Sequence, residues 1–299
     1  MSNSLWTLKQ SYGPIIAVVS VLFAGFPAFY ITTPQVRAAE SSGFTPLIIE
    51  KISVSRQLSL LRAICEPGKI SMHNGVPICN TCPSFTTGDQ ASRLSVSNAI
   101  EGNFTRLGTK QVLLDTIGCE PATSNAGGSV LLEPGESGWT RVLYLPGFRS
   151  NECIRFRTMQ QTASLACNMS SIEGGIQHGK LEWLNLRDAK PVQIHLLDWY
   201  DNSQSNPRQL VSIFPHRFMK SDFNSDGRVD LQVSLRMRDE TVPAKYPGYI
   251  DAMVAGHRFK KAESLRLVYL FDGSTLVLSP HSEPAKKDVD TVLKRIHDQ

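Results

Sequence analysis

Short apolar stretches recur between turn residues through most of the chain, which is typical of an all-β protein. The pattern predicts strands over Gln111–Leu114, Arg141–Leu145, Leu181–Leu186 and Val192–Leu196. The clearest strand is Leu231–Arg238, where apolar and polar residues alternate without exception. Such alternation predicts that one face of this strand lies in the core and the other faces water.

The C-terminal part of the chain predicts a hairpin followed by a helix. Leu265–Phe271 and Thr275–Ser279 are joined through Asp272 and Gly273, a dipeptide that tolerates the positive φ of a tight turn. The period then changes, because apolar residues recur at i, i+3, i+4 and i+7. These positions, Val289, Val292, Leu293 and Ile296, predict one apolar stripe on a short C-terminal helix.

Together these patterns predict a mainly β fold of antiparallel sheet with a short C-terminal helix. The sheet is expected to form a meander, an incomplete propeller or a sandwich. Four parts are expected: a signal peptide or anchor (1–38), a Cys-containing segment (39–95), a β domain (96–284) and the helix (285–299). The pattern assigns no element between 39 and 83.

A faint internal repeat bears on the architecture, because repeated β units are typical of propellers and related arrays. Phe104–Leu114 aligns with Phe223–Val233, with the Phe, the Gly and the apolar strand in common but not the acids. Phe156–Leu165 is a third, degenerate candidate. A chance match stays open, since short β patterns resemble one another by accident.

The N-terminal region predicts export. Its first thirteen residues contain Lys9 and no acid, and Pro14–Tyr30 is almost wholly apolar. Val36 and Ala38 are small enough for a signal peptidase to cut before Ala39. The alternative is an uncleaved anchor over residues 14–30, which is at the lower length limit for spanning a bilayer. The expected location is therefore the periplasm or the cell exterior, or a membrane-anchored state.

The charge of the chain weighs against nucleic acid as a partner. Removing residues 1–38 takes away Lys9 and Arg37 and no acid, so the net charge falls from +4 to +2. Binding to DNA or RNA normally requires a basic patch that neutralises phosphates. Here the Lys and Arg residues are scattered among acids.

The cysteines also fit export, since all six follow the expected cleavage site: Cys65, Cys79, Cys82, Cys119, Cys153 and Cys167. An even number in an exported chain predicts up to three disulfides. Cys153 and Cys167 fit the two sides of a hairpin. Cys119 is expected to pair with one of the three cysteines clustered before it.

One motif carries chemistry. Asp222, Asn224, Asp226 and Asp230 place oxygen side chains at positions 1, 3, 5 and 9, and the Gly at position 6 allows a sharp bend. Calcium takes six to eight oxygen ligands, and the backbone carbonyl of Arg228 at position 7 would supply one more. The spacing predicts a loop around Ca²⁺, although Asp, Asn and Gly also favour turns that bind nothing.

The loop is not an EF-hand, because Val233 stands where that motif needs a bidentate Glu. It resembles the calcium loop of the FG-GAP and VCBS families, whose DxNxDGxxDL signature runs into a strand as Asp230 and Leu231 do here. The resemblance implies that Asp222, Asn224, Asp226 and Asp230 are side-chain ligands. It also implies a β-propeller or β-rich array in which calcium stiffens a hairpin. Leu107 and Gln111 replace acids in the first repeat copy, so a complete propeller is not expected.

The sequence lacks the common hydrolase signatures, G-x-S-x-G and H-E-x-x-H, which weighs against an enzyme. Asp198 to Asp201 is more simply a solvated loop than a carboxylate site. We therefore expect an exported, calcium-stabilised, disulfide-bonded protein that binds a protein or glycan partner. A secreted hydrolase acting on a polymer, and a purely structural surface domain, remain the alternatives.

Overall fold

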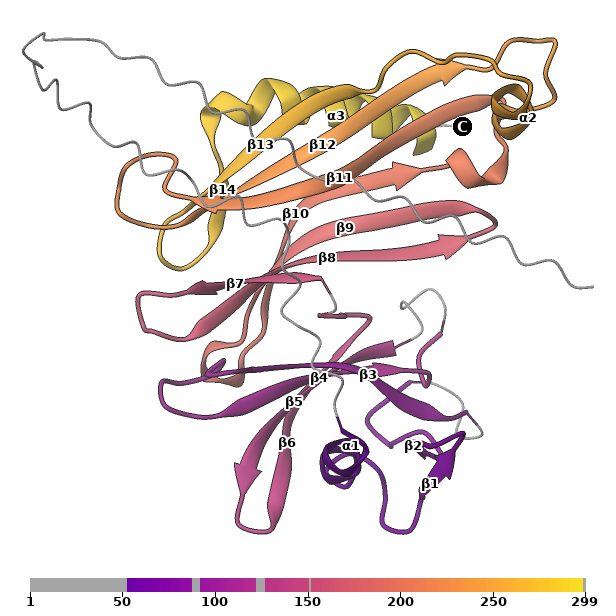
Figure 1. Ribbon diagram of the computed structural model, residues 1–299. Coiled ribbons are helices and arrows are strands. Elements are labelled where there is room, and N and C mark those ends of the chain that lie inside the picture. The colour runs from indigo at the N-terminus through magenta and orange to yellow at the C-terminus, as the bar shows by residue number, and fades with distance from the viewer. Residues whose placement is uncertain (1–52, 88–91, 122–126, 151, 298–299) are drawn as a thin grey trace, which may run out of the picture. The chain divides into compact units, whose positions relative to one another are not determined.

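The computed structural model describes residues 53–87, 92–121, 127–150 and 152–297. The expected export segment, including the cut before Ala39 and the anchor at 14–30, lies outside these described residues. Within them the chain forms two antiparallel sheets and a few short helices (Figure 1). The prediction of a mainly β fold with a short C-terminal helix is therefore confirmed.

The first sheet has six strands, each paired with the next along the chain. They are β1 (Ile70–His73), β2 (Val76–Cys79), β3 (Leu94–Gly102), β4 (Gln111–Ile117), β5 (Gly127–Gly135) and β6 (Gly138–Pro146). Helix α1 (Val54–Leu61) precedes them and begins where the Ser53 hydroxyl accepts a hydrogen bond from the Arg56 amide. Its buried Leu60 and Leu61 pack into the core of this sheet.

The second sheet is an eight-stranded meander, also paired in chain order. Its strands are β7 (Cys153–Arg157), β8 (Ala163–Glu173), β9 (Ile176–Asn185), β10 (Val192–Asp201), β11 (Gln209–Ser221), β12 (Asp230–Thr241), β13 (Glu263–Phe271) and β14 (Leu276–Leu278). Short helix α2 (Tyr249–Val254) lies between β12 and β13, and helix α3 (Glu283–His297) follows β14. Single 3₁₀ turns occupy Arg187–Ala189, Ser203–Ser205 and Pro280–Ser282.

The eight-stranded sheet curls into a half-barrel. Phe156 on the edge strand β7 lies 5.5 Å, between ring centroids, from Phe271 on β13 near the opposite edge. Trp183 on β9 contacts both rings at 5.3 and 5.5 Å. Aromatic rings at such spacings add to the apolar burial that favours the curl. The Met159 amide also donates to the Gly273 carbonyl, which ties the β7–β8 turn to the β13–β14 turn.

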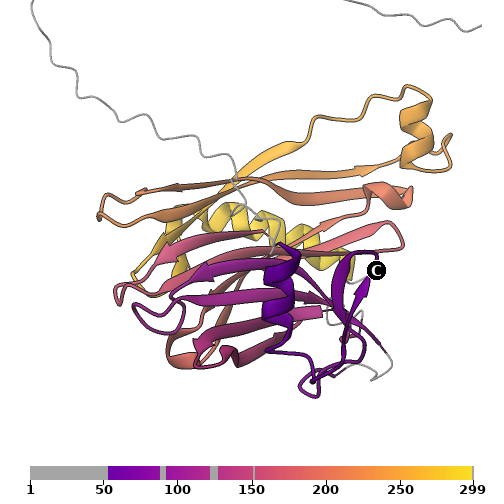
Figure 2. The same ribbon diagram turned by 60° about the horizontal axis from the view of Figure 1, so that its bottom comes forward.

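Helix α3 fills the concave side of this half-barrel. Val289, Val292 and Leu293 are buried in the same core as the inward residues of β9 to β13, and Ile296 packs against it. The predicted apolar stripe is therefore confirmed, and Figure 2 shows α3 between β11–β13 and β8–β9. No helix in the described ranges is long and apolar enough to cross a bilayer.

Three disulfides link the described chain. Cys153 and Cys167 are directly opposite across β7 and β8, with Cα atoms 4.0 Å apart, as the hairpin prediction required. Cys65 pairs with Cys79 and Cys82 with Cys119. The Cys79-x-x-Cys82 spacing therefore serves two separate structural bonds. The Cys82–Cys119 bond also joins the segment before β3 to the residues that follow β4. Because β1 and β2 belong to the same sheet as β3 to β6, residues on both sides of position 95 share one sheet.

The strand predictions hold in detail with one difference. Leu231–Arg238 lies in β12, and the Asp272–Gly273 turn joins β13 to β14 with Gly273 at φ +97°. Gln232 and Ser234, expected to face water, are buried. The reason is that longer side chains flank them on both neighbouring strands, Arg217 and Arg266 in the case of Ser234.

Val289→Ala is expected to lower the free energy of unfolding by about 1–3 kcal/mol, because it removes two fully buried methyl groups. Urea denaturation would measure the loss. The same substitution at Val277, which is 54% exposed on β14, is the control and should change stability by less than about 0.5 kcal/mol. Equal effects at both positions would contradict the placement of α3 in the core.

Candidate functional site

The predicted calcium loop is the connection between β11 and β12. Ser221 and Asp230 form the last register pair of the two strands, and residues 222–229 form the turn between them. Ser225 and Gly227 both have positive φ, 63° and 84°, which reverses the chain within the loop. The position predicted for the sharp glycine bend is thus confirmed.

Side-chain oxygens of the loop turn inward onto its own backbone. Asp222 accepts the Asp226 amide at 3.1 Å and the Gly227 amide at 2.8 Å. Asn224 Oδ1 accepts the same Asp226 amide at 3.1 Å. Two oxygens from positions 1 and 3 therefore lie together inside the turn.

Asp230, at position 9, has a structural role that the sequence does not reveal. Its carboxylate is fully buried, and one oxygen accepts the Phe223 amide at 2.9 Å. The other accepts the Phe271 amide of β13 at 2.8 Å. Asp230 thus joins the start of the loop to a strand 41 residues further on.

Arg228, expected to offer its backbone carbonyl, directs its guanidinium to acids. It lies 3.7 Å from an Asp226 carboxylate oxygen. Burial opposes ionisation of nearby Asp272, but hydrogen bonds from Thr275 and Ser274 and the Arg228 charge together hold the Asp272 pKa below its ordinary 3.8. The loop and the β13–β14 turn therefore form one charged corner of the sheet.

The repeat noticed in the sequence has a structural counterpart. The β3–β4 connection, residues 103–110, is another eight-residue loop, between the register pair Gly102 and Gln111. The Phe104 amide donates to Gln111 Oε1 at 3.0 Å, as the Phe223 amide donates to Asp230. Phe156, the start of the third candidate copy, lies inside β7 rather than in such a loop.

The two loops differ in the chemistry of their centres. In the first loop, Gln111 Nε2 donates to the Thr105 hydroxyl at 2.8 Å. Asn224 and Asp230 occupy the aligned positions in the second loop. There, a carboxylate that can only accept replaces the Gln111 amide that closes the first loop.

The structure brings together only part of the predicted ligand set. Asp222, Asn224 and Asp226 lie in one turn, whereas Asp230 uses both oxygens on backbone amides. In the described ranges no three His, Cys, Asp or Glu side chains are grouped so as to hold a metal.

The cluster from Asp198 to Asp201 belongs to β10 and not to a solvated loop. Asp198 is exposed and pairs with His195 at 3.1 Å. Trp199 is buried, donates to Asn168 at 2.8 Å and lies so close to Gly179 that a Cβ there would meet its ring at 1.9 Å. Asp201 lines a cavity of about 270 Å³. Asp198, Trp199 and Tyr200 line a smaller one of about 90 Å³.

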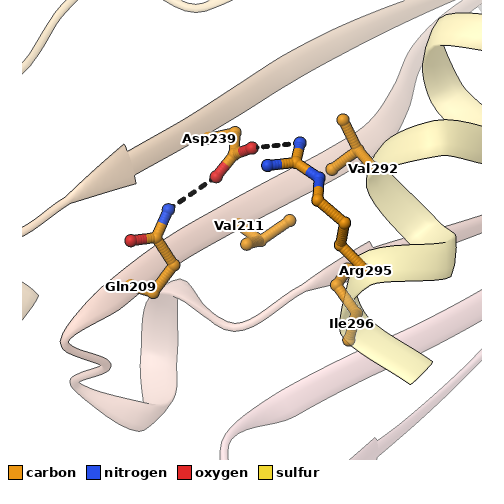
Figure 3. Close-up of a pocket in the computed structure, with 6 residues that line it drawn as sticks. All are labelled: Gln209, Val211, Asp239, Val292, Arg295 and Ile296. Carbon is orange, nitrogen blue, oxygen red and sulfur yellow. Dashed lines mark hydrogen bonds and ion pairs between the residues drawn. The ribbon is translucent and has the colours of Figure 1, made fainter. Parts of the chain in front are cut away.

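A pocket of about 310 Å³ lies beside the end of α3 (Figure 3). Asp239 on β12 accepts Gln209 Nε2 at 2.6 Å and Arg295 at 2.5 Å. Val211, Val292 and Ile296 form its apolar wall. The charges of Asp239 and Arg295 balance each other. Through Asp239, these bonds join α3 to β12 and β12 to β11.

A second pocket, of about 270 Å³, lies on the opposite face of β11 and β12, and we call it the outer pocket. It is lined by Asp201, Ser203, Leu210, Ser212, Phe214, Arg236, Arg238, Tyr249 and Ala262. Arg236, Arg238 and Tyr249 were not among the site residues predicted from the sequence. The available signal was two arginines at i and i+2 on the polar face of the clearest strand.

Comparisons of the chain with protein-family models, with curated proteins and with solved structures found no match. The likeness to FG-GAP and VCBS loops therefore rests on residues 222–233 alone.

Gly227→Ala and Gly108→Ala are each expected to lower the free energy of unfolding by about 1 kcal/mol in the presence of chelator. Both glycines have φ near +80° and open space around them, so backbone strain is the common cause. Chemical denaturation would measure the loss. A clearly larger cost at only one position would contradict the equivalence of the two loops.

Asp272→Asn should destabilise the protein at neutral pH but not in acid. The wild-type pKa is lowered on folding, so its carboxylate stabilises the fold above pH 3.8 and this contribution disappears as pH falls through the lower folded value. Denaturation of both proteins at pH 7 and pH 2.5 measures the difference. A constant difference between the two pH values would exclude an ionic contribution from Asp272.

Proposed function

We propose that this chain is an exported, calcium-stabilised β protein that acts as a binding module for a glycan or protein partner. The three disulfides support export, because such bonds form and persist in oxidising compartments such as the periplasm or cell exterior. The observation that carries the calcium part is the meeting of Asp222 and Asn224 oxygens on one backbone amide.

The ligands we propose are the side chains of Asp222, Asn224, Asp226 and Asp230 and the carbonyl of Arg228. An oxygen that accepts one N–H keeps a second lone pair, so the present hydrogen bonds are compatible with ligation. Asp226 would exchange its contacts with the Asn224 amide and Arg228 for the ion. Waters would complete the six to eight oxygens that calcium takes.

Comparison of the two hairpin loops supports this assignment. The first loop closes its centre with an amide donor from Gln111. The second has acids at the aligned positions of Leu107 and Gln111, so its centre is richer in acceptors than in donors. A hard cation satisfies such a surplus of oxygen acceptors.

Binding is favoured over polymer hydrolysis by the composition of the outer pocket. Asp201 does lie beside the aromatic rings of Phe214 and Tyr249, as a hydrolase cleft would require. Most glycoside hydrolases use two carboxylates flanking the bond that is cleaved. Asp201 is the one carboxylate among the described residues that line the pocket, and two arginines line it as well.

Calcium titration of the purified full chain, followed by melting with calcium and with chelator, tests the proposal. One ion is expected to bind per chain. At a calcium concentration 100 times the Kd, binding adds about 2.7 kcal/mol, which raises the melting temperature by about 5–10 °C. Absence of saturable uptake would reduce the loop to a turn.

Asp226→Ala is expected to abolish the calcium-dependent rise in melting temperature, because it removes a proposed ligand. Among the described residues, the hydrogen bonds and the ion pair of its carboxylate all lie within the loop. Asp198→Ala removes an exposed carboxylate from β10 and is the control, for which the rise should be unchanged. An unchanged rise in Asp226→Ala would remove that residue from the site.

A further inference from the structure

The outer pocket has an arginine that the fold leaves unsatisfied. Arg238 Nε is buried and has no hydrogen-bond partner among the described residues. Among the described residues, the one hydrogen bond of its guanidinium joins Nη1 to the Tyr249 hydroxyl, at 3.3 Å. Arg238 lines the pocket, so the N–H groups on the pocket side of its guanidinium can donate to an acceptor bound there.

The charges around Arg238 favour an anion. Arg236 lies two residues away on the same face of β12, is exposed, and forms no ion pair with a described carboxylate. Arg217 and Arg266 flank Ser234 on that face, and neither forms an ion pair with a carboxylate of the described residues. Burial lowers the pKa of His216, and the positive charges of Arg236 and Arg217 lower it further, so both charges act at this imidazole.

The nearest acids on β12 form no ion pair with Arg236 or Arg238 in the part of the chain that the structure describes. Asp239 points to the other side of the sheet, where it pairs with Arg295. Glu240 accepts the Lys260 backbone amide. Two arginines can therefore offer parallel N–H donors to a carboxylate or phosphate group, which is the geometry guanidinium groups bind best.

The other residues that line the pocket can bind a neutral group that carries hydroxyls. Asp201 accepts the Ser203 amide at 2.9 Å with one oxygen, and its carboxylate can accept further hydroxyl protons. Ser203 and Ser212 offer hydroxyl groups, and Phe214 and Tyr249 offer aromatic surface. Asp201 repels an anion on the arginines whether the anion is free or part of a sugar, but only a sugar can also donate a hydroxyl proton to its carboxylate.

The walls of the pocket are held in place before any ligand binds. Asn206 Oδ1 accepts the Ile250 amide at 2.7 Å, and the Tyr249 amide donates to the Pro207 carbonyl at 3.0 Å. These bonds tie α2 to the β10–β11 turn. Tyr249 also packs with Leu210, Val242 and Ala252 in a small separate core.

We propose that the outer pocket binds an anionic sugar unit, with its carboxylate or phosphate on Arg236 and Arg238 and a ring hydroxyl on Asp201. The volume, about 270 Å³, is at the small end of ligand pockets and suits one sugar unit. This inference specifies the glycan partner of the proposed binding function and rests on that function. Arg238 is eight residues along β12 from Asp230, about 26 Å, so pocket and calcium loop can be tested separately.

Calorimetric titration of the full chain with glucose 6-phosphate, glucuronate, glucose and inorganic phosphate tests the proposal. Saturable binding is expected for glucose 6-phosphate or glucuronate, and whichever binds identifies the anion as phosphate or carboxylate. Binding at least ten-fold weaker is expected for glucose and for inorganic phosphate, since each lacks one half of the recognised group. Equal affinity for glucose 6-phosphate and inorganic phosphate, or no saturable binding at all, would overturn the proposal.

Variants separate the pocket from general electrostatic attraction. Arg238→Gln should weaken binding of the anionic sugar about ten-fold or more, because it removes charge-assisted hydrogen bonds. Arg236→Gln, at an exposed position, is expected to act in the same direction and keeps the test available if Arg238→Gln does not fold. Arg266→Gln removes the same charge from the same face outside the pocket and should change affinity by less than about two-fold, in line with screened surface charges. Equal losses in Arg266→Gln and Arg238→Gln would overturn the site.

Asp201→Asn tests the sugar half of the recognition. It is expected to strengthen binding of inorganic phosphate, because it removes the repelling charge. It is also expected to reduce the ratio of sugar affinity to phosphate affinity, because a neutral amide accepts the sugar hydroxyl more weakly than a carboxylate does. An unchanged preference would exclude Asp201 from the contact. Calcium uptake by the unsubstituted chain is measured in the same samples as sugar binding. Sugar binding without calcium binding would count against the calcium loop only, and calcium binding without sugar binding would count against the pocket only.

Discussion

The curl of the eight-stranded sheet is the constraint on which the other features depend. Phe156 near one edge reaches Phe271 near the other, with Trp183 between them, and this brings the inner face of the sheet around a concave space. Such a space must be filled with apolar side chains, because an empty cavity loses packing contacts with every atom that lines it. Helix α3 fills it with the stripe that includes Val289 and Leu293.

The residues of β12 that face the core also determine which of its residues lie on the convex face of the sheet. Successive side chains of a strand point to opposite faces, so each residue of β12 that packs on α3 places its neighbours on the convex side. Leu235 and Met237 contact the core, and Arg236 and Arg238 therefore lie outside it. The α2 segment covers one end of this convex face, and the hollow left beside it is the outer pocket.

The loops that join β3 to β4 and β11 to β12 share a backbone arrangement but differ in the side chains at their centres. Each connects its strands through eight residues, and each begins with a Phe amide that donates to a fully buried side chain seven positions later. Gln111 provides both acceptor and donor, so its loop is complete without a ligand. Asp230 provides acceptors only, and its second oxygen fastens the loop to β13.

Local features of this chain could be predicted from the sequence alone. Alternation predicted β12, the Asp-Gly dipeptide predicted the last hairpin, the i, i+3, i+4, i+7 stripe predicted α3, and the spacing of Cys153 and Cys167 predicted their bond. Each of these depends on residues close together in the chain, whose side-chain period or turn chemistry records the local backbone. The Asp222–Gly227 turn could likewise be predicted from residues that are close together in the chain.

Only the tertiary structure decided how these elements combine. The division into two sheets, the helix α1, the bond from Asp230 to β13 and the convergence of Asp201, Arg238 and Tyr249 all join residues far apart in the sequence. Local periodicity carries no record of such distances, because it repeats the same inward and outward pattern whether a sheet is flat or curled. The sequence thus determined that Arg236 and Arg238 share a polar face, and the curl with its α2 cover decided that this face contains a pocket.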